Sequence, residues 1–188
     1  MAPARAHRKR PPLDQKRLEE LALRYVERFA TTRAKLRSYL TRKLRERGWE
    51  SDGEPDVEAI AGRFADQGYV DDAAYALAKS QALAGRGYGK RRLLEKLRAA
   101  GVEEADSGAA REHADGEALA AALRFAERRR IGPFASEPPR DRKDRERALA
   151  TMVRAGHSFS LAREIVDLAP GSAIDPAELR ERARLTAN

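Results

Sequence analysis

The sequence contains no cysteine, and aromatic residues make up only 6% of its 188 residues. Without cysteine the chain can form no disulfide, no thiolate nucleophile and no cysteine-based zinc site. No stretch approaches the roughly 18 apolar residues of a membrane-spanning helix, and the N-terminus lacks the apolar core of a secretory signal. We therefore expect a cytoplasmic protein that makes no contact with a membrane.

Charged residues are abundant instead and supply 36% of the chain, with 38 Lys and Arg against 30 Asp and Glu. Most of the apolar content comes from Ala and Leu, which together with this charge is typical of amphipathic helices. The sequence therefore predicts an all-α protein. Its net charge of +8 favours polyanions or acidic protein surfaces as partners.

Apolar residues at three- and four-residue spacing predict three helices within residues 13–68. Asp14 is placed to cap the first of these helices, and Thr31 or Thr32 to cap the second. The third helix is expected to start at Pro55, because proline is well tolerated in the first turn.

A similar helix ending recurs along the chain. Gly48, Gly101 and Gly156 each follow a helical segment, and they lie 53 and 55 residues apart. The fourth residue before each glycine is apolar: Leu44, Leu97 and Met152. An interval of this size is typical of repeat proteins, although three unrelated helices could share the pattern by coincidence. We predict three tandem three-helix modules, at residues 13–68, 69–114 and 115–169.

The remaining segments have their own composition. Residues 1–12 are basic, end in two prolines and have no apolar face, which predicts a disordered basic arm. A proline-rich loop is expected at about residues 131–144, inside the third module. Residues 170–188 are predicted to form a short C-terminal helix and a tail, with Asp175 as the N-cap.

The segment at residues 68–72, GYVDD, is interpreted as a junction between two helices. Gly68 would end one helix, and Asp71 or Asp72 would cap the next. Tyr69 and Val70 are expected to pack across the junction.

A second glycine-rich segment, RGYG, precedes a basic helix that ends before Gly101. Gly87 and Gly89 permit a sharp turn, which is the structural interpretation of this motif. The functional interpretation is a cationic edge with one aromatic side chain that contacts phosphates or an acidic protein surface. The candidate contact residues are Arg33, Lys35, Arg37, Arg42, Arg86, Tyr88, Lys90, Arg91, Arg92 and Lys96.

No residue pattern indicates catalysis. The three histidines are scattered, with none at helical ligand spacing from another, so we expect no metal site. Gly89 and Lys90 are not followed by Ser or Thr, which excludes a nucleotide-binding phosphate loop. We expect no catalytic residue, no cofactor and no enzymatic activity, whereas a hydrolase or transferase would need a convergent polar site.

The segments GYVDD at 68–72 and RGYGKRRLLEKL at 86–97 resemble the central motifs of the RecX family of recombinase regulators. Residues 32–36 look like that family's Ser-Arg-x-Glu-Leu helix opening, with Lys35 where an acidic residue is usual. The resemblance covers about residues 15–168. It implies tandem three-helix modules in an elongated, curved arrangement that lies in the groove of a RecA–DNA filament. It also implies inhibition of the recombinase, ATPase and coprotease activities of RecA, and thereby regulation of DNA repair.

The expected partners are therefore the RecA filament and single-stranded DNA, with double-stranded DNA as a further target through its phosphates. The chain itself is expected to be a monomer. The alternative is a non-specific or helix-turn-helix DNA-binding protein that acts without RecA. The basic helices offer few Asn or Gln side chains for base recognition, which favours phosphate contact.

Overall fold

The computed structural model describes residues 11–186. This part of the chain forms ten α-helices and two short 3-10 helices, and its extended pairing is limited to one isolated bridge between Leu13 and Trp49. The predicted all-α class is therefore confirmed. The predicted basic arm, residues 1–12, lies outside the described residues except for its last two positions.

The helices gather into two compact units. The first unit extends to Tyr75 and also includes residues Ala100–Val102, and the second contains Ala76–Ala99 and the chain from Glu103 onward. Each unit is described separately below. The division into three modules stays a prediction.

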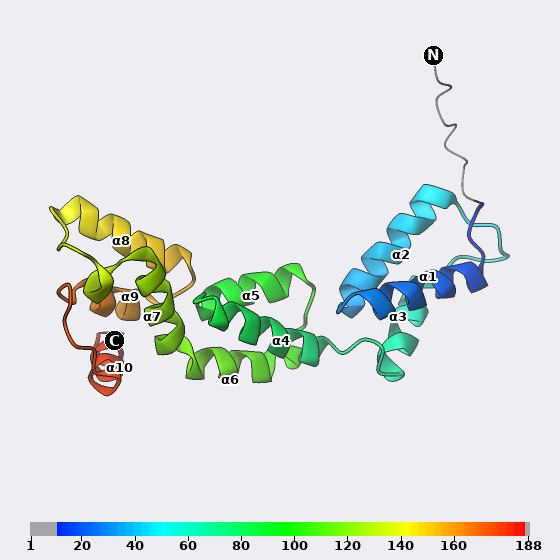
Figure 1. The fold of residues 1–188 in the computed structure, drawn as a ribbon. Helices are drawn as coiled ribbons and strands as arrows, with labels where there is room; N and C mark the ends of the chain where they lie inside the picture. The colour runs from blue at the N-terminus through cyan, green and yellow to red at the C-terminus, as the bar shows by residue number, and fades with distance from the viewer. Residues whose placement is uncertain (1–10, 187–188) are drawn as a thin grey trace, which may run out of the picture. The chain divides into compact units, whose positions relative to one another are not determined.

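Three helices build the first unit: α1 (Gln15–Arg28), α2 (Arg33–Arg47) and α3 (Val57–Asp66) (Figure 1). Helix α2 packs against both α1 and α3. The core collects the apolar positions of all three helices, and its buried members are Leu13, Leu18, Ala22, Leu36, Leu40, Ile60, Ala61, Phe64 and Val70.

The helix starts in this unit are set by side-chain caps. The Asp14 carboxylate accepts a hydrogen bond from the Arg17 amide at 2.7 Å, which confirms Asp14 as an N-cap. The predicted start of α3 at Pro55 is wrong. Asp56 accepts from the Ala59 amide at 2.8 Å, so the helix begins at Val57. The Asp56 carboxylate satisfies a free amide of the first turn, and a capping residue lies directly before the first helical residue.

The second unit contains most of α4 (Asp72–Gly85), followed by α5 (Lys90–Ala99) and α6 (Gly108–Gly116). Leu93 and Leu97 of α5 are buried, as are Ala110 and Ala114 of α6. The buried Ser80 hydroxyl of α4 donates a hydrogen bond to the Ala110 carbonyl at 2.9 Å. The Ser80 hydroxyl therefore links α4 to α6 and is itself satisfied although it is buried.

The C-terminal part of this unit consists of α7 (Ala118–Arg129), α8 (Arg142–Arg154), α9 (Phe159–Val166) and α10 (Pro176–Leu185) (Figure 1). Its buried core is formed by Leu119, Ala122, Phe125, Ala126, Ile131, Leu149, Met152, Ala155, Leu161, Ala162, Ile165, Val166 and Leu179. A 3-10 turn at Gly132–Phe134 opens the predicted proline-rich loop, and α8 begins within its expected range. Asp175 accepts from the Ala177 amide at 2.8 Å, which confirms it as the N-cap of α10.

Among the described residues, none of the helices is both long enough and apolar enough to cross a membrane.

Candidate functional site

The basic residues of α2 form the first candidate surface. This helix carries seven Lys and Arg residues and one acidic residue, Glu46. Arg37, Arg42 and Arg45 line a shallow hollow on the exposed side of the helix, together with Ser38 and Thr41. Guanidinium groups and hydroxyls on one face are suited to the oxygens of a phosphate backbone.

The predicted contact residues at the start of α2 are engaged inside the first unit. The Arg33 amide donates to a carboxylate oxygen of Asp72 at 2.9 Å, and the Arg33 guanidinium lies 3.5 Å from the other oxygen. The Lys35 ammonium donates to the Tyr75 hydroxyl at 2.5 Å and lies over that ring. Both residues therefore stabilise the junction between α2 and the start of α4.

The later contact residues of α2 are more accessible. The Arg37 guanidinium lies 2.6 Å from a Glu58 carboxylate oxygen, but this pair is at the surface and contributes little to stability. Arg42 is exposed and lies 3.7 Å from Glu46, on its own helix. Gly48, which ends the helix, has a φ of +80° and donates its amide to the Leu44 carbonyl.

The junction at residues 68–72 combines two caps. Asp71 caps α4, because its carboxylate accepts from the Ala74 amide at 2.8 Å. Asp72 is 6% exposed and serves α2, through the bond from the Arg33 amide. Gly68 has a φ of +76°, and Val70 is buried as expected. The Tyr69 ring lies 5.5 Å from that of Phe64, although the residue is 53% exposed.

The second candidate surface begins at the RGYG turn, which the structure seats against α7 and the end of α8. A Cβ atom on Gly87 would lie 2.9 Å from the Phe125 amide nitrogen, and one on Gly89 would lie 2.3 Å from the Gly156 carbonyl oxygen. The Gly89 amide donates to the Ala155 carbonyl at 3.0 Å, and the Arg91 amide donates to the Gly156 carbonyl at 3.1 Å. The carbonyls at the end of α8 and the amides at the start of α5 have no partner within their own helices. They therefore satisfy each other.

His157 packs against this turn and against Phe125. Its Nε2 atom lies 3.1 Å from the Gly87 carbonyl, and the ring lies 5.6 Å from that of Phe125. Burial lowers the pKa of His157 to about 4, although the Gly87 carbonyl opposes the shift. The imidazole is therefore neutral at physiological pH, and Nε2 donates its proton to the carbonyl.

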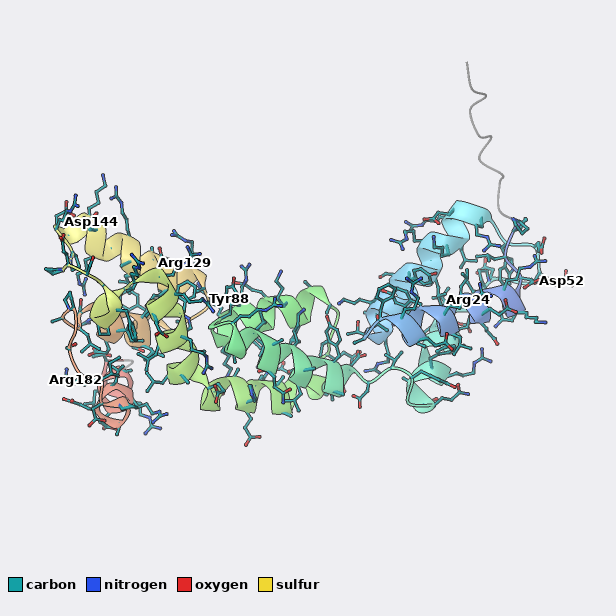
Figure 2. All side chains as sticks on the ribbon, in the orientation of Figure 1. Arg24, Asp52, Tyr88, Arg129, Asp144 and Arg182 are labelled. Carbon is teal, nitrogen blue, oxygen red and sulfur yellow. The ribbon has the colours of Figure 1, made fainter. Side chains whose placement is uncertain are left out.

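Cations flank the aromatic rings beside this turn. The Tyr88 and Phe125 rings lie 6.3 Å apart, and the Arg92 guanidinium lies over Tyr88 at 5.9 Å. Arg128 and Arg129 lie over Phe125, and Figure 2 labels Tyr88 and Arg129. The sequence interpretation did not include Arg128 and Arg129, because only folding brings the end of α7 to the turn.

The other predicted contact residues, at the turn and on α5, differ in their interactions. The Lys90 ammonium lies 2.6 Å from an Asp115 carboxylate oxygen, and Arg91 donates from its side chain to the Val153 carbonyl at 2.8 Å. Arg92 lies 3.8 Å from Glu95. The side chains of Arg86 and Lys96 are exposed and have no hydrogen bond or ion pair within residues 11–186, so both are available to an external anion.

No group of His, Asp or Glu side chains in the described part of the chain is arranged to hold a metal ion. The two candidate surfaces consist of cations, hydroxyls and aromatic rings. Surfaces of this chemistry can bind a polyanion or an acidic protein.

Comparison with known proteins places the chain in a family. A 161-residue alignment with the regulatory protein RecX of Myxococcus xanthus is 33% identical and covers 81% of this chain and 86% of the relative. The chain belongs to the RecX family. The RecX protein of Mycobacterium sp. strain KMS, at 33% identity over 89% of this chain and 88% of the relative, agrees with this assignment. So does that of Thermus thermophilus, at 34% identity over 79% of this chain and 89% of the relative. A scan against protein-family models found no match. The RecX relatives are named regulatory proteins, which supports a regulatory role.

Proposed function

We propose that this chain binds RecA nucleoprotein filaments and inhibits their recombinase, ATPase and coprotease activities. The observation that carries the proposal is membership of the RecX family across most of the chain. Inhibition of this kind can be achieved by binding alone. The cationic surfaces supply the physical means of binding a filament of protein and DNA.

The two cationic surfaces favour a distributed mode of binding. Many individually weak contacts to successive subunits and phosphates add up, because each contact raises the effective concentration of the next. If about six cations neutralise phosphates, the affinity for duplex DNA falls with salt at a logarithmic slope of about −5. Binding to the filament should therefore exceed binding to RecA alone or to DNA alone.

The direct test measures RecA ATPase on single-stranded DNA, and RecA coprotease activity, with increasing amounts of the protein. Inhibition of both activities at micromolar concentration or below is the expected result. Full RecA activity throughout that range would reject the proposal. Strong sequence preference for duplex DNA in the absence of RecA would replace it with a helix-turn-helix function.

The structure identifies the variant that best isolates the second surface. Arg86→Ala with Lys96→Ala removes two exposed side-chain cations that make no intramolecular bond within the described residues, so folding should be unchanged. Inhibition should weaken by about ten-fold, the effect of losing two charge contacts to phosphate or carboxylate. The control is Arg142→Ala with Arg147→Ala, which removes the same charge from exposed positions on α8. Equal effects of the two double variants would show that only total charge matters.

A further inference from the structure

Three aromatic rings form a row between α1 and α2 in the first unit. The rings of Tyr25 and Tyr39 are stacked, with centroids 4.2 Å apart and an interplanar angle of 12°. The Phe29 ring lies 5.4 Å from that of Tyr25 and is tilted by 48°. The row thus continues from a stacked pair to the ring at the C-terminal end of α1.

Burial changes along this row. Tyr25 and Tyr39 pack partly against the core of the first unit. Phe29 is 52% exposed and is not a member of that core. The two tyrosines therefore support the fold, and Phe29 leaves an aromatic surface open to solvent.

Cations lie over the exposed end and the inner end of the row. The Arg28 guanidinium lies 5.7 Å from the centroid of Phe29, and its side chain has no carboxylate partner within residues 11–186. Arg42 and Lys43 lie over the Tyr39 ring, at 5.6 and 5.8 Å. Both also approach Glu46, so the cations of α2 are partly neutralised.

This combination separates Phe29 from the other exposed aromatic residues. Phe159 is 60% exposed, but no cation lies over its ring within the described residues. An exposed aromatic ring alone needs no ligand to explain it. An exposed ring with a cation beside it matches the two parts of a nucleotide, because the base can stack on the ring while its phosphate meets the cation.

We propose that the row formed by Tyr25, Phe29 and Tyr39 is a base-stacking site for single-stranded DNA. One base stacks on the solvent-exposed part of the Phe29 ring, and a neighbouring phosphate contacts the Arg28 guanidinium. Glu20, Glu27 and Glu46 on the same helices oppose a phosphate. Arg24, Arg42 and Lys43 are paired with Glu20 or Glu46, whereas Arg28 has no carboxylate partner within residues 11–186. Bases of an intact duplex are stacked on each other, so the site selects single strands. This inference deepens the proposed function by naming its contact with DNA.

The test uses the full chain without any recombinase, so its failure is distinct from failure of filament inhibition. Fluorescence anisotropy compares a labelled oligodeoxythymidylate with an abasic strand of the same length and charge. The wild-type chain should bind the thymidylate strand more tightly. Phe29→Ala should lower that affinity by roughly ten-fold, the effect of losing one stacked base, and leave the affinity for the abasic strand unchanged.

Two further variants keep the result interpretable. Phe159→Ala removes a ring that is at least as exposed as Phe29 and should not change the affinity for either strand. Phe29→Trp should retain tight binding, and its added tryptophan emission should be quenched by the thymidylate strand. Equal binding of both strands by the wild type, or unchanged thymidylate affinity in Phe29→Ala, would overturn the proposal. Weaker filament inhibition with unchanged thymidylate affinity in Phe29→Ala would assign Phe29 to a protein contact instead.

Discussion

Gly101 and Gly156 occupy equivalent places in the two units but are held by different chemistry. In the first unit, the Ala100 carbonyl accepts a hydrogen bond from the Thr32 hydroxyl at 2.6 Å, at the start of α2. In the second unit, the Ala155 carbonyl accepts from the Gly89 amide at 3.0 Å, at the start of α5. Thr32 and Gly89 each directly precede their helix. In both units, therefore, the residue before a helix donates a hydrogen bond to the carbonyl of an alanine that is followed by glycine.

The difference lies in how closely the backbones approach. A Cβ on Gly101 would lie 2.3 Å from the Ala34 Cβ, which is a side-chain contact. A Cβ on Gly156 would lie 2.5 Å from the Arg92 amide nitrogen, and one on Gly89 would meet the Gly156 backbone. A side-chain hydroxyl therefore bridges the first contact, whereas direct backbone pairing forms the second. The Ala34 Cβ is fixed to its own backbone and cannot rotate away, so neither contact has room for an added Cβ, but only the second is formed by backbone on both sides.

The largest expected effect on stability is at the second contact. Gly89→Ala places a methyl group against the Gly156 carbonyl, so the free energy of unfolding should fall by about 3 kcal/mol. Gly85→Ala is the control, because no atom lies within 4 Å of its Cβ position and alanine favours helix. Thermal unfolding measures both variants. A Gly89→Ala protein as stable as Gly85→Ala would show that the second contact has room for a methyl group.

His157 gives the second contact a pH dependence for which the first has no counterpart, since Val102 follows Gly101. Folding holds the imidazole neutral, with its pKa lowered from 6.5 to about 4. Stability due to His157 is therefore complete above pH 6.5 and decreases as the pH falls toward 4. The loss approaches about 3 kcal/mol at most.

The measurement is denaturant unfolding of the wild type and of His157→Gln between about pH 7 and pH 4, the range that spans the shift. The carboxylates titrate in both proteins at the lower end of this range, so the difference between the two curves isolates the imidazole. His157→Gln should lose less stability than the wild type over this range. Parallel curves would contradict a buried neutral histidine.

A smaller effect is expected at the first contact. Thr32 is completely buried, and its hydroxyl both donates to the Ala100 carbonyl and accepts from the Lys35 amide at 3.2 Å. Thr32→Ala should lower the free energy of unfolding by about 1–2 kcal/mol, the usual effect of removing an N-cap. Thr32→Ser keeps the hydroxyl and should retain most of the stability. Equal losses in the two variants would indicate that the methyl group, and not the hydroxyl, stabilises this contact.

The smallest effect concerns the exposed rim of the second contact. Arg91 donates to the Val153 carbonyl from an exposed side chain, so Arg91→Ala should lower stability by only about 0.5 kcal/mol. Arg91→Lys, which keeps the charge but not the planar guanidinium, serves as the comparison. Chemical denaturation can resolve a difference of this size. A loss of stability comparable to that of Gly89→Ala would show that side chains, and not the backbone, supply most of the stability of this contact.

Sequence patterns predicted the helix starts where a local cap dictates them. Asp14, Thr32 and Asp175 lie directly before their helices and cap them, because a cap bonds to an amide two or three residues away. Pro55 and Tyr69 show what such local patterns could not predict. Asp56 caps the helix, so the helix starts at Val57 and not at Pro55, and no periodic pattern could show that Tyr69 is exposed.

The candidate site was only partly visible in the sequence. The basic character of α2 and α5 is evident from their composition, but the partners of individual cations are not. Arg33 pairs with Asp72, 39 residues away, and Arg91 reaches the Val153 carbonyl, 62 residues away. Arg128 and Arg129 were missed for the same reason.

The sequence by itself determined the all-α class, the glycine-ended helices and the motifs by which the chain resembles the RecX family. Those features depend on local periodicity, capping and residue type, which act over a few positions. Only the tertiary structure decided which glycines are needed for close backbone contact, which cations are paired, and that Phe29 forms the open end of an aromatic row. These properties depend on groups that are distant in sequence and become neighbours only when the helices pack.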